Sequence, residues 1–296
     1  MVEDLRRRCR FPEPGSPLTC AVSGGADSLA LMVLATAAGC RVTAVHVDHG
    51  LRPGSASEAD VVASAAARFG AAFRSERVQV RPGPNVEARA RKARRRVLPL
   101  DAATGHTADD QAETMLLNLV RGAGRDGLGG MRPGPTKPLL ALRRSETRAL
   151  CSALALEPVV DPSNLDPGLR RNRVRHELLP LLESIARRDV VPVLTRQADL
   201  MRDEADLLDE LSSALDGNDG HSLAAAPPAL ARRAVRRLVT PAASEDHHLR
   251  GEDRHPPSAA AVERVLSVAR KEVTACEVPG GVRVRRSAGR LYLDRS

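Results

Sequence analysis

The sequence predicts an α/β protein: a doubly wound parallel sheet, followed by a helical linker and a small α+β C-terminal domain. Three observations support this fold class. A β-prone run at 18–22 leads through a Gly-rich loop into an apolar helix. Strand-like and helix-like runs then alternate as far as about residue 160. A turn cluster at 216–220 separates this part from later helices and short strands. We therefore expect two domains, residues 1–215 and 216–296.

The Gly-rich loop is the first element, and it is expected to bind an anion. The free N–H groups at the start of the following helix and the positive end of its dipole both face the loop. Glycine lets the backbone approach a phosphate closely, and serine hydroxyls add donors. The pattern is neither a Walker A motif nor a dinucleotide fingerprint. The expected phosphate-binding residues are Ser23, Gly24, Gly25, Ala26, Asp27 and Ser28.

The remaining elements follow from hydrophobic periodicity and from turn residues. A short helix precedes residue 17, and a helix that starts after the loop ends at Gly39. The other predicted strands of the sheet are 41–47, 72–80 and 102–105, and 158–164 completes the alternation. Predicted helices are 55–69, 86–97, 108–121, 145–155 and a helical region from about 172 to 215, with a mobile loop at 122–135. The C-terminal domain has predicted helices at 228–239 and 258–270 and strands at 273–278, 282–286 and 290–293.

Composition limits the class of protein. Hydrophobic residues make up 42% and charged residues 28%, as in a soluble globular protein. With no Trp, one Tyr and three Phe, the core must consist of Leu, Val and Ala, and base stacking is disfavoured as a main mode of RNA binding. The net charge of +8 comes almost entirely from arginine, since the only lysines are Lys92, Lys137 and Lys271. A nucleic-acid partner is compatible with this charge, and so is a codon bias toward arginine.

Cysteines and apolar runs indicate the compartment. The five cysteines form no Cys-x-x-Cys pair, which argues against a zinc or iron–sulfur site and indicates a reducing environment. The charged segment 1–10 has no apolar core typical of a signal peptide, and no apolar run approaches the roughly 20 residues of a membrane span. We expect a cytoplasmic protein without membrane contact. A homodimer is compatible with the sequence, which leaves the oligomeric state open.

Two polar segments follow predicted strands at the edge where open α/β sheets bind ligands. The first, His46-Val-Asp-His-Gly-Leu-Arg, is either a strand-end loop with satisfied histidines or a metal site. The second, 104–114, contains His106 and puts Asp110 and Glu113 on one helical face. Paired carboxylates there can bind Mg²⁺ or a substrate ammonium. The alternative is helix capping by Asp109 and Asp110, and both roles can coexist.

Two basic segments are the other candidates for binding. The helix 86–97 places Glu87, Arg91 and Arg94 on one face, where arginine could neutralise a triphosphate or hold RNA. The segment 161–175 is an acidic loop followed by a basic run that ends at Arg175. A solvated charged surface explains either segment equally well.

Taken in order, these motifs resemble those of the tRNA(Ile)-lysidine synthase family of PP-loop ATP pyrophosphatases. The resemblance covers about residues 18–180. It rests on Ser-Gly-Gly-x-Asp-Ser, His-Val-Asp-His-Gly-Leu-Arg, Glu-Ala-x-Ala-Arg, Thr-Gly-His-x-Ala-Asp-Asp-Gln-Ala-Glu-Thr, Arg-Gly-Ala-Gly, Gly-Leu-x-Gly-Met and Asp-Pro-Ser-Asn with Arg-Asn-Arg-x-Arg. Three positions depart from the family pattern: Arg95 in place of a Tyr, Thr107 in place of a second His, and Val160 in place of an acidic residue.

The resemblance implies a ligase that joins L-lysine to C2 of the wobble cytidine in tRNA(Ile) with a CAU anticodon. The cytidine O2 attacks the α-phosphate of ATP and pyrophosphate leaves; the lysine amine then displaces AMP, which changes the codon read from AUG to AUA. The loop would hold the pyrophosphate end of ATP together with His46 and Arg91, and Asp27 would bind Mg²⁺. Asp110 and Glu113 would bind the lysine ammonium and supply the base. The other implied substrate contacts are His106, Arg94, Arg175 and a tRNA-binding C-terminal domain.

Two rival functions remain open from the sequence. One is another PP-loop enzyme that modifies a tRNA base, such as a cytidine thiolase, although the expected central cysteine pair is missing from this sequence. The other is a non-catalytic adenine-nucleotide or RNA-binding protein. That function would account for the basic charge and the loop, but not for the paired carboxylates after His106.

Overall fold

The computed structural model describes residues 1–48, 50, 55–79, 86–240 and 257–295. The chain forms two compact units, Met1–Arg202 and Asp203–Ser296. The boundary lies inside the long helix α10 (Val191–Ser213), whereas the sequence predicts it at the turn cluster that follows this helix.

The first unit is built on a parallel sheet, as predicted. Its four strands lie in the order β3-β2-β1-β4. Cys20 in the central strand pairs with Ala44 and Ala103, and all three are fully buried. The chain moves outward from β1 to β3 and then returns to the other side of β1, so β1 and β4 enclose the topological switch point where open sheets bind ligands. The strands are β1 (Pro17–Ala21), β2 (Arg41–Asp48), β3 (Ala72–Arg77) and β4 (Ala103–Thr104).

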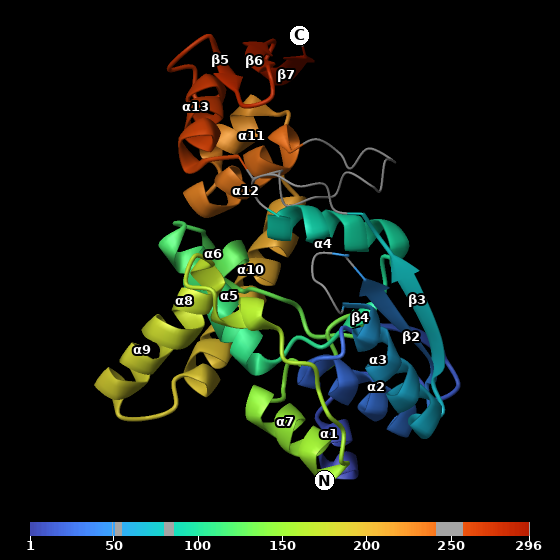
Figure 1. Ribbon diagram of the computed structural model, residues 1–296. Helices are drawn as coiled ribbons and strands as arrows, with labels where there is room; N and C mark the ends of the chain where they lie inside the picture. The colour runs from blue at the N-terminus through green and yellow to red at the C-terminus, as the bar shows by residue number, and fades with distance from the viewer. Residues whose placement is uncertain (49, 51–54, 80–85, 241–256, 296) are drawn as a thin grey trace. The chain divides into compact units, whose positions relative to one another are not determined.

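Helix α2 (Ala26–Ala37) is the core of this unit. Its residues from Ser28 to Ala35 are all buried, because the helix packs against the sheet, α1 and α7 at once. In Figure 1, α2 and α3 lie in front of β2, and α4 lies near the carboxyl end of β3. Gly39 and Gly70 follow the ends of α2 and α3 with positive φ angles, which glycine adopts without strain, and Gly39 is the predicted end of its helix. The helices around the sheet are α1 (Val2–Arg7), α3 (Ser55–Phe69), α4 (Val86–Val97) and α7 (Arg144–Ala153).

A second apolar cluster joins α5 to the helices that follow the sheet. Ala112 and Leu116 of α5 pack with Val174, Leu179 and Val191. The elements here are α5 (Ala108–Val120), α6 (Arg125–Leu128), the 3-10 helix η1 (Pro162–Leu165), α8 (Arg170–Arg173), the π-helical turn η2 (Val174–Leu178) and α9 (Leu179–Ala186).

Three sequence expectations differ from the structure of this unit. The loop 122–135, expected to be mobile, contains α6 and is held by Gln111, which donates to Gly129 and accepts from the Met131 N–H. Strand β3 ends at Arg77 and is shorter than predicted. The segment near Val159 forms no strand. Instead, the Val159 N–H donates to the Gly24 carbonyl at 3.0 Å, so this segment lies beside the Gly-rich loop.

The second unit is a small α+β domain, in agreement with the sequence. Three antiparallel strands in the order β5-β6-β7 pack on helices through a core that includes Leu223, Val235, Leu266 and Val284. Its elements after α10 are α11 (Gly220–Ala225), α12 (Pro228–Val239), α13 (Ala259–Ala269), β5 (Ala275–Val278), β6 (Val282–Ser287) and β7 (Arg290–Arg295). None of the helices in the described ranges combines the length and apolarity that a membrane crossing requires.

Candidate functional site

The Gly-rich loop lies at the carboxyl end of the central strand β1 and opens α2. Gly24 has a φ of +85°, and a Cβ at this position would lie 3.0 Å from Val159 Cγ2. Both facts require glycine here. The Ser28 hydroxyl donates to the Gly25 carbonyl at 2.8 Å and accepts from the Ser23 N–H at 3.1 Å. Ser28 therefore fixes the shape of the loop. The first backbone N–H groups of α2 lack acceptors within the helix, and they lie where the loop meets the helix, in a place suited to an anion.

Asp27 connects this loop to α7. Its carboxylate accepts from the Thr147 hydroxyl, and Oδ2 lies 3.5 Å from Nε of Arg144. Burial raises the pKa of Asp27, while Thr147 and Arg144 counteract part of that effect. No local pattern in the sequence marked Thr147 or Arg144 as functional. Thr147 lies on the predicted helix 145–155 and Arg144 directly before it, and both reach Asp27 only through the fold, in which α7 begins at Arg144.

Asp110 combines the two roles that the sequence allowed. Its Oδ2 accepts from the backbone N–H and the hydroxyl of Thr107, at 2.9 and 3.0 Å, which caps α5. Its Oδ1 accepts from Nη2 of Arg144 at 2.8 Å. Burial by itself would raise the pKa of Asp110, but Arg144 and Arg171 outweigh it and the pKa is lowered. Asp110 is therefore charged. Its Oδ2 caps α5, and its Oδ1 faces Arg144 in the site.

Glu113 lies one turn further along α5 and has no exposed surface. Its Oε1 accepts from Arg144 at 3.1 Å and from Nε of Arg175 at 2.7 Å. Its Oε2 accepts from Nε of Arg171 at 2.7 Å and from Nη2 of Arg175 at 3.1 Å. Three guanidinium groups from two separate helical segments thus converge on one buried carboxylate.

These residues form a single network, which we call the arginine–carboxylate cluster. Arg144 is its centre, because its guanidinium reaches Asp27, Asp110 and Glu113 together. The carboxylates in turn raise the pKa of Arg144 above its ordinary value. The cluster joins the phosphate loop to α5, and its members are Asp27, Asp110, Glu113, Arg144, Arg171 and Arg175.

His106 lies just before α5 and is neutral near pH 7. Its Nδ1 is 2.8 Å from the hydroxyl of Thr104 at the end of β4. Burial, with a further contribution from Lys137, lowers the pKa of His106 to about 4. An imidazole in this state can donate or accept a hydrogen bond to a substrate but carries no charge.

His46 lies near the carboxyl end of β2, as His106 lies just after the carboxyl end of β4. Its ring is 2% exposed, and Nδ1 lies 3.0 Å from the Val22 carbonyl, directly before the loop. Since a carbonyl only accepts, Nδ1 is the donor. Within the described part of the chain, Nε2 has no hydrogen-bond partner. His49, which would complete a His/Asp/His metal site, lies outside the described residues, and no group of three metal-binding side chains occurs among those that are described.

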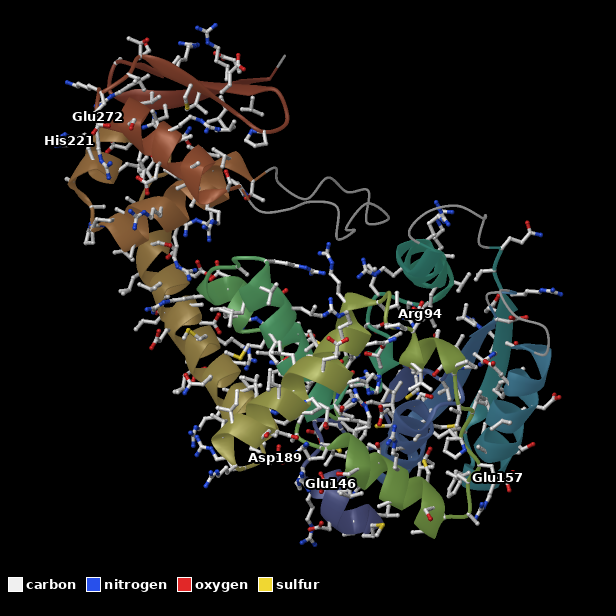
Figure 2. All side chains as sticks on the ribbon, turned by 60° about the vertical axis from the view of Figure 1, so that its left-hand side comes forward. Arg94, Glu146, Glu157, Asp189, His221 and Glu272 are labelled. Carbon is white, nitrogen blue, oxygen red and sulfur yellow. The ribbon has the colours of Figure 1, made fainter. Side chains whose placement is uncertain are left out.

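The other predicted residues are distributed differently. Arg175 is in the arginine–carboxylate cluster, whereas Arg94 lies on α4 and acts on His106 through its charge (Figure 2). The side chain of Arg91 lies outside the described residues. A Mg²⁺ ion fits the cluster by residue type, because Mg²⁺ commonly takes one carboxylate together with phosphate oxygens, and Asp27 lies in the phosphate loop itself.

Gly105 gives the first testable prediction, because it packs directly on the loop backbone. A Cβ at this position would lie 2.6 Å from the Asp27 carbonyl oxygen. Gly105→Ala is expected to lower the free energy of unfolding by about 1–3 kcal/mol in urea denaturation, since backbone must move to relieve the overlap. Gly124→Ala is the matched control, because an added Cβ there meets nothing within 4 Å. Equal stability of the two variants would contradict the close contact.

The comparisons with known proteins agree with this geometry. Residues 4–182 match the PP-loop domain family. A tRNA(Ile)-lysidine synthase of Salinispora tropica is 44% identical, with 98% of this chain and 95% of the relative covered. One of Thermobifida fusca is 36% identical over the same shares of the two chains. Among solved structures, a U34-tRNA thiolase of Methanococcus maripaludis shares the fold with a TM-score of 0.55 at 17% identity, covering 68% of this chain and 77% of that one.

The two kinds of match define the family together. The PP-loop match spans the sheet and the arginine–carboxylate cluster, and the full-length relatives extend through the second unit. The chain belongs to the tRNA(Ile)-lysidine synthase family of PP-loop proteins.

Proposed function

We propose that this protein ligates L-lysine to C2 of the wobble cytidine in tRNA(Ile) with a CAU anticodon, using ATP and releasing AMP and pyrophosphate. One observation carries the proposal. Arg144 joins Asp27 in the phosphate loop to Asp110 and Glu113 on α5, so groups suited to a nucleotide and groups suited to an amine lie in one site.

The first half-reaction needs stabilisation of negative charge. The cytidine O2 attacks the α-phosphate, and the bond to the pyrophosphate breaks. Backbone N–H groups of Gly24, Gly25, Ala26 and Asp27 are proposed to bind the leaving pyrophosphate, while the Ser23 and Ser28 N–H groups hold the loop through their bonds to the Ser28 hydroxyl and the Gly25 carbonyl. Mg²⁺ supplies further positive charge at the phosphate oxygens, with Asp27 as its protein ligand. Arg91 and His46 are proposed to bind the nucleotide, His46 through the acceptor Nε2.

The second half-reaction needs a bound amine. The lysine ammonium first loses a proton to solvent. The free amine then attacks C2 of the adenylated cytidine, and AMP leaves with the electrons of the C–O bond. Asp110 is the carboxylate that can meet the lysine ammonium, because its side chain is 12% exposed while that of Glu113 is fully buried. Since the pKa of Asp110 is lowered, it supplies charge complementarity to the ammonium rather than a site for its proton. Glu113 contributes by fixing Arg144, Arg171 and Arg175 around Asp110.

The tRNA contacts are assigned by charge. His106 and Arg94 lie at the carboxyl side of the sheet, where the cytidine must meet the nucleotide. The second unit is proposed to bind the tRNA body. On β6, Arg283 and Arg285 are exposed while Val282 and Val284 are buried, so this strand presents arginine to its outer side. A cytoplasmic location follows from such a substrate.

The rival functions fit less well. A thiolase needs reactive cysteines, but burial raises the pKa of Cys20 to about 12 and that of Cys151 to about 11. A purely nucleotide-binding protein would not need Asp110 and Glu113 held against the phosphate loop by Arg144.

Labelled lysine tests the proposal directly. The full chain, ATP and Mg²⁺ are incubated with in vitro transcribed tRNA(Ile) that carries either a CAU or a UAU anticodon. We expect label in the CAU transcript only, with AMP formed in equal amount. AMP formation that depends on neither lysine nor the anticodon would favour a binding or hydrolytic protein instead. Light scattering of the same sample tests the homodimer that the sequence allows.

A further inference from the structure

Lys137 is a half-buried cation that lies outside the Gly-rich loop and outside the arginine–carboxylate cluster. It follows a tight turn, in which its N–H donates to the Gly134 carbonyl at 2.9 Å. The preceding residue, Thr136, accepts from the Thr104 N–H at 3.1 Å, so this segment runs beside β4. The ammonium Nζ donates to the Thr104 hydroxyl at 2.6 Å. Lys137 therefore lies at the carboxyl end of the sheet, next to the topological switch point.

Among the described residues, no carboxylate forms an ion pair with this ammonium. Its acceptor in the described part of the chain is the neutral hydroxyl of Thr104, which also contacts Nδ1 of the neutral His106. The charged groups that act on it are Arg94 and Arg95 of α4, and both are cations. Burial, together with these two arginines, lowers the pKa of Lys137 to about 8. A half-buried ammonium that donates to a neutral hydroxyl is unfavourable unless an anion approaches it.

Close packing connects Lys137 to the phosphate loop. Thr104, whose hydroxyl accepts the hydrogen bond of Lys137, is followed by Gly105, and a Cβ on Gly105 would lie 2.6 Å from the Asp27 carbonyl oxygen. The strand end that carries the Thr104–Lys137 contact thus touches the first turn of α2, where backbone N–H groups at the helix start are suited to bind an anion. The ligand that fits both features is a phosphate oxyanion.

We propose that Lys137 binds a phosphate oxyanion of the nucleotide held by the loop, with Thr104 orienting its ammonium. This inference rests on the proposed use of ATP at the same site. It adds a phosphate-binding residue on the far side of β4 from β1, outside the Gly-rich loop and outside the arginine–carboxylate cluster.

The proposal has a consequence for the pH dependence of binding. Without nucleotide, Lys137 loses its proton as the pH rises through about 8. An adjacent phosphate favours the charged form, so ATP binding above this pH must take up a proton. Affinity for ATP therefore falls with rising pH, by up to roughly tenfold for each pH unit. Arg94 and Arg95 are the charged side chains that act on Lys137, and His106, with a pKa of about 4, is neutral throughout this range.

ATP titrations of the full chain between pH 6.5 and 9.5, without tRNA or lysine, test the proposal. Lys137→Met is expected to bind ATP roughly tenfold or more weakly at neutral pH, the usual loss for a hydrogen bond to a charged group, and to lose the alkaline fall. Lys137→Arg should keep the affinity at neutral pH and also lose the alkaline fall, because arginine does not titrate there. The control is Lys271→Met, which removes the same charge at an exposed position of the second unit. Its ATP affinity and its pH profile should equal those of the wild type.

The outcomes separate this inference from the proposed function. Wild-type affinity and an unchanged pH profile in both Lys137 variants would overturn it, even where the wild type makes lysidine. A raised KM for tRNA with unchanged ATP affinity would overturn it as well, and would move the contact to a tRNA phosphate. If Lys137→Met does not fold, the pH profile of Lys137→Arg decides. Conversely, the wild type could show an ATP affinity that falls above pH 8 and yet incorporate no lysine. That result would support the phosphate contact of Lys137 and contradict the proposed ligase activity.

Discussion

Replacing Asp27 by asparagine is expected to abolish ATP–pyrophosphate exchange measured in the presence of tRNA, with a loss of roughly a thousandfold or more. Asparagine can still accept the hydrogen bond of Thr147, so the shape of the loop is kept. It cannot form the ion pair with Arg144, and it offers no charge to a metal ion. The exchange assay isolates the adenylation step, where these charges act on the phosphates.

The control for this variant is Asp101→Asn, an exposed carboxylate outside the cluster, which should retain exchange. The pH profile gives a second readout. Because burial raises the pKa of Asp27, exchange by the wild type should fall as the pH is lowered through that pKa, and added Mg²⁺ should shift the fall to lower pH by competing with the proton. Exchange by Asp27→Asn that equals wild type would exclude Asp27 from the nucleotide site.

Most of the sheet could be predicted because its signals are local. Strand β1, the Gly-rich loop and α2 follow one another without interruption, and Gly39 and Gly70 end helices through positive φ angles that the sequence identifies directly. The limits appear where tertiary contacts decide. The Gly-rich segment 122–135 looks mobile by composition, yet the side chain of Gln111 orders it from a different element.

The candidate site could be predicted only in part, for the same reason. Asp27, Asp110 and Glu113 belong to patterned motifs, but Arg144 and Arg171 reach them from positions more than thirty residues away along the chain. No spacing rule connects such residues before the fold is known. Lys137 did carry a signal: it is one of three lysines in a chain that otherwise uses arginine for positive charge.

One departure from the family pattern has a structural explanation. Thr107 stands where a second histidine is common, and it is fully buried. Its N–H and its hydroxyl both donate to Oδ2 of Asp110, which fixes the start of α5. This position therefore serves the orientation of Asp110, so that Oδ1 remains directed to Arg144.

Glu113→Gln is expected to cause the largest loss of stability, about 3–5 kcal/mol in the free energy of unfolding, because it removes a fully buried anion that pairs with three guanidinium groups and leaves Asp110 as the carboxylate that all three share. A glutamine oxygen can accept from one arginine, but its NH₂ group would face another guanidinium. Arg144, Arg171 and Arg175 would then repel one another with less negative charge between them, in surroundings where their side chains are only partly exposed. Urea denaturation of the full chain measures the change, and Glu177→Gln, which removes an exposed partner of Arg173, should leave the midpoint unchanged.

A second substitution separates uncompensated charge from a simple packing defect. Adding Arg175→Met to Glu113→Gln removes one of the stranded cations, so the double variant should be more stable than Glu113→Gln alone. A packing defect predicts the opposite, because two altered side chains would disturb the interior more than one. If Glu113→Gln lowers the free energy of unfolding by less than about 1 kcal/mol, the three arginines do not need the charge of Glu113 to keep their positions. The proposal that Glu113 holds them around Asp110 would then be wrong.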